Sequence, residues 1–216
     1  MSERLACPSV HKFLREVERR LRNRCGSSWC KWIDGLPLPV GGSTEDPDAR
    51  YGRAAGIMAK GYKLHAICDA RGGLDVWEVT SMNVNEQKAA RFLVSLLEGE
   101  GYLVGDGEYD ANALYDLAAE RGFQLVSPHR KGTRLGHICH SPYRLRSRQL
   151  LAGPFGDGLL HARAGIDRFF GQMGNFAGGL GPLPHWVRGL HRVRQWVHGK
   201  IIFNAARWDK NKRLTA

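Results

Sequence analysis

The chain has 216 residues, 43% of them hydrophobic and 25% charged, and its formal net charge at pH 7 is +11. This length suits one well-buried core with at most a small appendage. No apolar stretch approaches the ~20 residues of a membrane helix, and the N-terminus lacks a signal-peptide core, so we expect a cytoplasmic protein with no membrane partner.

The first third of the chain predicts a helix, a strand and a loop. Apolar residues recur at helical spacing from Pro8 onward, which indicates an amphipathic helix. A strand follows over Trp29–Ile33 and ends at Asp34. The prolines of Leu36–Pro39 argue against a helix or a central strand immediately afterwards, and Gly41–Met58, rich in Gly, Ser, Asp and Arg, is expected to be a mobile loop.

The middle of the chain predicts a hairpin followed by a helix. Tyr62–Cys68 alternates between apolar and polar residues, and Val76–Thr80 is a second strand-like run, so the two form an antiparallel hairpin. Asn83–Glu86 resembles a helix-capping arrangement, and the apolar spacing carries that helix to Gly99.

The next elements complete a predicted order of three strands, helix, strand, helix, strand. A short strand contains Leu103, and Asp110 stands where the N-cap of the next helix belongs. A last strand covers Phe123–Ser127. Residues 129–160 look irregular, helical spacing returns from Ile166, and a final helix runs roughly over Trp186–Trp208.

Charge is distributed unevenly along the chain. Residues 1–33 carry 8 basic and 3 acidic side chains, residues 34–128 carry 8 and 15, and residues 129–216 carry 16 and 3. Basic flanks favour a polyanion partner. An acidic centre between them suggests carboxylates that hold cations, with phosphates attracted from outside.

Asp106 lies within Tyr102–Asp110, where a short apolar run stands between glycines. In α/β sheets, ligands bind at the carboxyl ends of strands, which makes Asp106 a candidate site residue. Turns also favour Asp and Gly for conformational reasons, so this stretch by itself fits both a site and a plain turn.

Three carboxylates stand at comparable places: Asp34 and Asp106 at strand ends, and Asp167 on the helix after the basic segment. Three carboxylates around a cleft can hold two divalent ions ~3.5–4 Å apart, as in-line phosphoryl displacement requires. This pattern indicates nuclease or strand-transfer chemistry. Arg163 and Asp167, four residues apart, also fit an ordinary surface ion pair.

Four blocks carry a resemblance to a known family: Trp32–Val40, Lys60–His65, Val104–Asp110 and Arg163–Phe170. In order and spacing they resemble the catalytic domain of bacterial insertion-sequence transposases of the DDE class, from about Asp34 to Lys200. The resemblance implies an α/β, ribonuclease-H-like mixed sheet flanked by helices. It also implies Mg²⁺ or Mn²⁺ held by two aspartates and a glutamate.

The resemblance also assigns residues. Asp34 and Asp106 match the first two metal ligands, and Asp167 takes the place of the third, which makes these three the expected catalytic and metal-binding residues. Arg163 is expected near a DNA phosphate, with Lys63 and His65 at the edge of the site. Further DNA-binding candidates come from the basic segment: Arg130, Lys131, Arg134, Arg144, Arg146 and Arg148.

The chain departs from the family pattern at its last helix. Where relatives commonly carry Tyr, Arg, Glu and Lys, this sequence has Leu160, Arg163, Asp167 and Gly174. Asp is shorter than Glu by one methylene, and Mg²⁺ demands ligands at ~2.0–2.1 Å, although Asp is the usual third residue in mariner-type enzymes. Only 33 residues precede Asp34, where full-length relatives usually carry a DNA-reading domain.

The implied function is that of a DNA transposase that cleaves DNA and transfers an insertion sequence, acting on element ends and target. We expect it to be nucleoid-associated and a homodimer when assembled on DNA. The alternatives are a truncated or degenerate remnant that binds DNA without cutting it, and a host nuclease on the same fold. The expected divisions are an N-terminal helix and lead-in (1–33), a catalytic domain (34–208) and a basic tail (209–216).

Five cysteines with no framework spacing predict reduced thiols. A zinc site is conceivable from Cys25, Cys30, His137, Cys139 and His140. Their spacing matches no common zinc finger.

Overall fold

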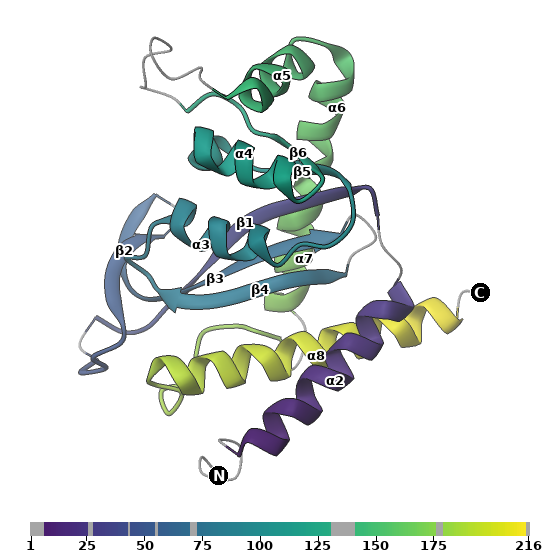
Figure 1. The fold of residues 1–216 in the computed structure, drawn as a ribbon. Helices are drawn as coiled ribbons and strands as arrows, with labels where there is room; N and C mark the ends of the chain where they lie inside the picture. The colour runs from purple at the N-terminus through teal and green to yellow at the C-terminus, as the bar shows by residue number, and fades with distance from the viewer. Residues whose placement is uncertain are drawn as a thin grey trace.

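One mixed six-stranded sheet, with helices on both faces, forms the centre of the protein (Figure 1). The computed structural model describes residues 7–25, 28–42, 44–54, 56–69, 73–130, 141–175 and 179–214. Its strands are β1 (Cys30–Pro39), β2 (Arg50–Ala54), β3 (Ile57–Asp69), β4 (Leu74–Ser81), β5 (Gly101–Val104) and β6 (Phe123–Val126). Its helices are α2 (Pro8–Cys25), α3 (Glu86–Ser95), the 3₁₀ turn η1 (Gly107–Tyr109), α4 (Asn112–Glu120), α5 (Pro142–Leu151), α6 (Pro154–Ala162), α7 (Ala164–Asn175) and α8 (Leu190–Leu214).

Strand β1 is the centre of the sheet and has a different kind of neighbour on each side. It pairs antiparallel with β3, and parallel with β5. Beyond these, β4 and β2 pair antiparallel with β3, and β6 pairs parallel with β5. The pairings give the order β4-β3-β1-β5-β6, with β2 alongside the first part of β3.

The prediction that the first strand ends at Asp34 is wrong, because β1 continues through both prolines to Pro39. Pairing with β5 stops at Trp32 opposite Val104, so only β3 accompanies the rest of β1. The amide of Val40 donates to the carbonyl of Lys60 at 2.8 Å. By the antiparallel alternation, the nitrogens of Pro37 and Pro39 therefore point away from β3, where no ladder bond is lost.

Other predicted elements are confirmed or corrected. The β3/β4 hairpin is confirmed, and so is the helix α3, whose N-cap Asn85 accepts a bond from the amide of Gln87. The predicted loop over 41–58 contains β2 and the start of β3, so four strands precede α3 instead of three. The predicted irregular region contains α5 and α6, which begin with Pro142 and Pro154 at favourable first-turn positions.

Two elements extend across the expected divisions of the chain. Strand β1 crosses the boundary between residues 33 and 34, and α8 continues through the expected tail to Leu214. Helix α2 crosses α8 (Figure 1) and is attached to the sheet by Glu18, which accepts a 2.8 Å bond from the indole of Trp77 and lies 2.8 Å from His198 Nε2. None of the described helices combines the length and apolarity needed to cross a membrane.

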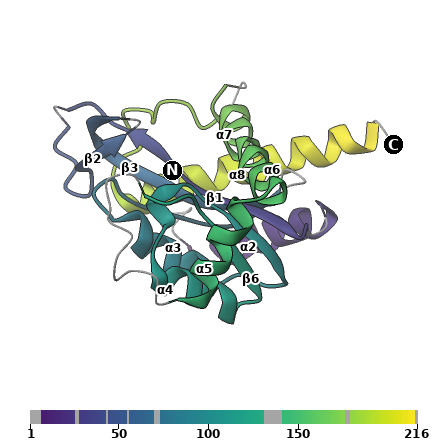
Figure 2. The ribbon, with the colours of Figure 1, turned by 90° about the horizontal axis from the view of Figure 1, so that it is seen from above.

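Two hydrophobic cores lie on opposite faces of the sheet, and strand alternation decides which residue enters which core. Trp32 and Val104 belong to the core covered by α7 and α8, whereas Ile33 and Leu103 belong to the core covered by α3 and α4. Figure 2 shows α3 and α4 on one side of the strands and α7 on the other. Asp34 shares the parity of Trp32, which places it on the α7 face.

Candidate active site

Asp34 and Asp106 are brought together by the parallel register of β1 and β5. That register ends with Trp32 opposite Val104. Both aspartates lie two residues further along their chains, and Asp106 is still in extended backbone. Since neighbouring strands are about 4.8 Å apart and both residues share the parity of their α7-facing neighbours, the two carboxylates lie on the same face at the point where the strands diverge.

The Asp34 carboxylate is held by two donors. The amide of Gly35 donates to Oδ1 at 2.7 Å, and Arg163 Nη1 donates to Oδ2 at 3.0 Å. The pKa of Asp34 is raised to about 6, chiefly by burial and with smaller contributions from the charges of Asp106 and Asp167, while the Gly35 bond and Arg163 act to lower it. The three acids and Arg163 therefore form one electrostatically coupled group.

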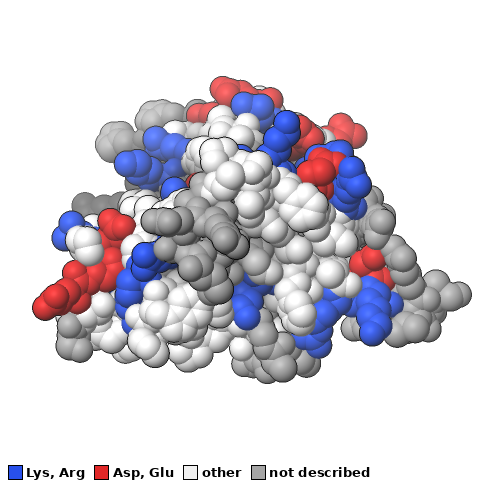
Figure 3. Space-filling view, turned by 90° about the horizontal axis from the view of Figure 1, so that it is seen from below, with Lys and Arg blue, Asp and Glu red and all other residues white. Residues whose placement is uncertain are grey.

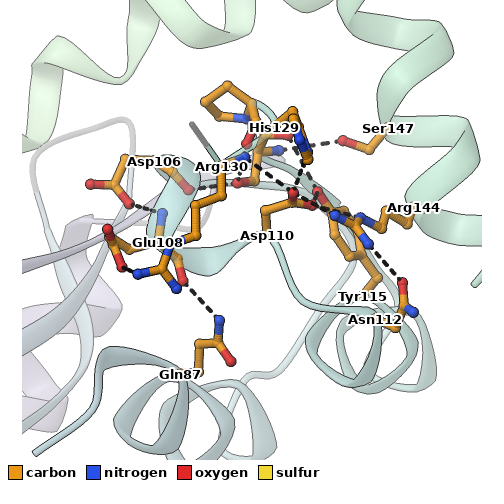
Figure 4. Close-up of polar contacts among 12 residues, drawn as sticks. Gln87, Asp106, Glu108, Asp110, Asn112, Tyr115, His129, Arg130, Arg144 and Ser147 are labelled. Carbon is orange, nitrogen blue, oxygen red and sulfur yellow. Dashed lines mark hydrogen bonds and ion pairs between the residues drawn. The ribbon is translucent and has the colours of Figure 1, made fainter. Parts of the chain in front are cut away.

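Asp106 is fixed as the N-cap of η1 (Figure 4). Its Oδ1 accepts a bond from the amide of Glu108 at 2.9 Å, and its carbonyl accepts one from Ser127 Oγ. The buried ring of Tyr109 packs on Gly105, where a β-carbon would lie only 2.8 Å from Tyr109 Cδ2. Glycine at 105 therefore lets the turn fold back closely against the sheet.

Arg163 contacts Asp34 from the start of α7, and the charge of Asp167 acts on Asp34 from the same helix. Arg163 is the single residue between α6 and α7, and Asp167 is exposed in the first turn of α7. Gly165 follows Arg163 by two positions, and a β-carbon at Gly165 would lie 2.3 Å from the Trp32 ring. Glycine thus allows this end of α7 to approach β1 closely enough for Arg163 to contact Asp34.

The donor set suits a hard cation, because carboxylate oxygens are the ligands that Mg²⁺ and Mn²⁺ prefer. The pKa of Asp34 is raised mainly by burial and also by the charges of Asp106 and Asp167, and a bound cation would stabilise the ionised carboxylate. Within the described residues, no three His, Cys, Asp or Glu side chains are close enough together to hold one ion. The acids therefore form an acidic site of suitable chemistry rather than a closed coordination shell.

Residues 26–202, which include all of these elements except α2 and the end of α8, match the family model described as the transposase DDE domain. The chain belongs to this transposase family. No curated protein matches it. Among solved structures, it resembles a piggyBac transposase chain in a synaptic complex with hairpin DNA, at 15% identity and a TM-score of 0.41, over 62% of this chain and 32% of that one.

Two predicted site residues of this transposase domain lie elsewhere. In the register, His65 faces Gly35 and Lys63 faces Pro37, so both side chains take the parity opposite to Asp34 and point to the α3 face. His65 is 1% exposed, and burial, with the nearby charge of Lys63, lowers its pKa to about 4. Lys63 is buried in an ion pair with Glu86. The expectation that they line the edge of the active site is therefore corrected.

The predicted basic residues separate into several groups. Arg144 is buried against Asp110, so it does not belong to the exposed basic surface. Arg146 and Arg148 are exposed on α5, and Arg130 is half-exposed in a 3.1 Å ion pair with Glu108. Lys131 and Arg134 lie outside the described residues.

The positions at which this chain departs from the family pattern lie on α6 and α7. Leu160 is partly buried against the core of the α7 face. A β-carbon at Gly174 would meet nothing within 4 Å. A side chain at position 174 would therefore meet no neighbouring atom at its β-carbon.

Asp110 has a different role from the predicted one. The N-cap of α4 is Ala111, without a side-chain bond, and Asp110 instead binds Arg144. No local pattern signals this contact, because the two residues are 34 positions apart and α5 was not predicted.

The zinc hypothesis rests mostly on undescribed side chains. Those of Cys25, His137, Cys139 and His140 lie outside the described residues. Cys30 is a buried free thiol, and burial raises its pKa to about 11, which disfavours the thiolate that zinc binding requires.

Proposed function

We propose that this chain is the catalytic domain of a DDE-class DNA transposase with a ribonuclease-H-like arrangement of its sheet. The observation that carries the proposal is the adjacency of Asp34 and Asp106 at the divergence of β1 and β5, with Arg163 bound to Asp34 from the start of α7. The strand order, with an antiparallel neighbour on one side of β1 and a parallel neighbour on the other, supports the fold assignment.

Asp34, Asp106 and Asp167 would hold two divalent cations, Mg²⁺ or Mn²⁺. When bound, such ions lower the pKa of an attacking water and neutralise charge on a phosphodiester. Arg163 uses Nη1 for Asp34, and a guanidinium has five N–H donors. With its side chain 28% exposed, Arg163 can therefore orient Asp34 and bond a DNA phosphate at the same time.

DNA would also be held electrostatically by exposed arginines outside the acidic site. Arg146 and Arg148 project from α5, and Arg130 stands next to the Asp106 turn, bonded to Glu108. Lys131 and Arg134 remain proposed contacts from the same basic segment. Assembly as a homodimer on element ends and association with the nucleoid belong to the same proposal.

Nicking of supercoiled plasmid by the purified chain, in Mg²⁺ and in Mn²⁺, tests this function. We expect metal-dependent nicking that Asp106→Asn abolishes, and joining of a cut 3′ end to a second duplex. Cutting without joining would instead indicate a nuclease.

A second candidate, a non-cleaving DNA-binding remnant, is favoured by one observation. Both oxygens of Asp34 already accept bonds, from Gly35 and from Arg163. DNA binding without nicking in either metal would support it.

A further inference from the structure

The carboxylate of Asp110 lies at the other end of the η1 turn from Asp106 and accepts two hydrogen bonds from Arg144 (Figure 4). Nε of Arg144 donates to Oδ1 at 2.7 Å, and Nη2 donates to Oδ2 at 2.6 Å. Tyr115 donates to Oδ1 at 3.3 Å, and the amide of Arg130 donates to Oδ2 at 3.2 Å. Each of the paired side chains is only 3% exposed.

A deeply buried ion pair contributes little net stability compared with apolar residues in the same place. Desolvating two charges costs several kcal/mol, and well-packed apolar residues of similar volume are often equally stable or more so. A two-bond contact between a planar guanidinium and a carboxylate does, however, fix distance and angle. Its distinctive contribution is therefore geometrical.

The Asp110–Arg144 pair positions the η1 turn, which begins at Asp106. Only Gly107, Glu108 and Tyr109 separate the two aspartates, and they form the single turn η1, whose N-cap is Asp106 and whose C-cap is Asp110. Fixing Asp110 therefore restricts where Asp106 can lie.

Helix α5, which carries Arg144, also supports Asp106 by a second route. On α5, one turn after Arg144, Ser147 Oγ accepts a 3.3 Å bond from the amide of Ser127. Ser127 Oγ in turn donates to the carbonyl of Asp106. Helix α5 thus holds both the end of β6 and the end of η1.

We propose that Asp110 and Arg144 are positioning residues that hold η1 and thereby keep Asp106 beside Asp34. This inference rests on the proposed function, since it assigns the pair to the carboxylate that would bind metal. Outer-shell partners of metal-ligating residues typically change metal affinity or activity by roughly 10–100-fold when they are lost.

The test uses the double variant Asp110→Leu/Arg144→Met, which removes both buried charges together and so leaves neither unpaired. Exposed Glu98→Gln and Arg91→Met serve as charge-matched controls. We would measure the melting temperature, kcat and KM for DNA nicking, Mn²⁺ affinity by electron paramagnetic resonance, and hydrogen exchange of residues 105–111.

We expect the double variant to remain folded with an unchanged KM for DNA. Its kcat and Mn²⁺ affinity should fall by roughly 10–100-fold, and exchange in 105–111 should accelerate, while the controls match the wild type. A folded double variant whose Mn²⁺ affinity and exchange stay within twofold of the wild type would overturn the proposal. If the double variant does not fold, Asp110→Asn, which keeps the shape of the side chain, takes its place in the same comparison.

Mn²⁺ binding and hydrogen exchange do not depend on catalysis. A wild-type protein without nicking activity would therefore overturn the proposed function, while these two measurements would still decide the positioning role.

Discussion

Gly165 lies directly against the Trp32 ring, and a β-carbon at this position would be 2.3 Å from the ring. This contact sets how closely α7 approaches β1, and so whether Arg163 reaches Asp34. Seen from below (Figure 3), the molecule carries separate groups of Lys and Arg side chains, some of them beside Asp and Glu, with uncharged side chains between the groups.

Gly165→Ala should therefore lower both stability and nicking, because the added methyl group forces α7 away from β1. Overpacking of this kind typically costs about 1–3 kcal/mol. The matched control is Gly174→Ala on the same helix, where a β-carbon meets nothing within 4 Å and the change should stabilise by about 0.5–1 kcal/mol. Chemical denaturation measures both variants, and equal effects of the two would contradict this account of the Trp32 contact.

Asp34→Asn should stabilise the metal-free protein more at pH 7.5 than at pH 4.5. Because the pKa of Asp34 is about 6 when folded and 3.8 in its ordinary state, the folded protein binds this proton more tightly. Protonated Asp34 therefore adds to the free energy of unfolding of the wild type at low pH, and this contribution is lost as pH rises from about 4 through 6. The difference between variant and wild type should change by on the order of 2 kcal/mol.

Urea unfolding in the presence of EDTA at the two pH values measures this difference. His65, whose pKa is lowered to about 4 by burial, acts in the opposite direction, but it is present in both proteins and its contribution cancels. Glu98→Gln, at an exposed position, should show no such pH dependence. A difference between Asp34→Asn and the wild type that does not change with pH would contradict the raised pKa of Asp34.

DNA affinity should fall steeply with salt, with a slope in log affinity of about −0.9 per phosphate neutralised. Replacing Arg146 and Arg148 with Gln should reduce the magnitude of that slope by about 2. Arg91→Gln/Arg121→Gln, which removes two exposed positive charges from α3 and the end of α4, should leave it unchanged. Fluorescence anisotropy with a labelled duplex measures the slopes, and identical slopes for the two double variants would remove α5 from the proposed interface.

Variants of Asp167 distinguish most directly between an active enzyme and a non-cleaving remnant. If α7 lies at the distance suited to glutamate, Asp167→Glu should increase Mg²⁺-dependent nicking, because the shorter side chain leaves a cation under-coordinated. If α7 lies closer, the extra methylene should crowd the site and reduce nicking. Equal nicking by wild type, Asp167→Glu and Asp167→Ala, with Asp106→Ala inactive, would exclude Asp167 as a ligand.

The sequence by itself determined the elements whose signals are local. Alternation predicted the β3/β4 hairpin, the capping arrangement over Asn83–Glu86 predicted the start of α3, and ordered blocks around Asp34, Asp106 and Arg163 predicted the family. Each of these depends on residues within a few positions of one another, or on a fixed chain order, which a sequence records directly.

Only the tertiary structure decided which side chains meet. Whether Pro37 can sit in a strand depends on where β5 stops pairing, and the parity of the β1/β3 register sends Lys63 and His65 to the face opposite Asp34. Arg144 belongs to a basic segment of the kind that contacts DNA at a protein surface. In the structure, however, its side chain is buried in an ion pair with Asp110. Register, helix rotation and burial are set by packing between segments far apart in the chain, so no local pattern specifies them.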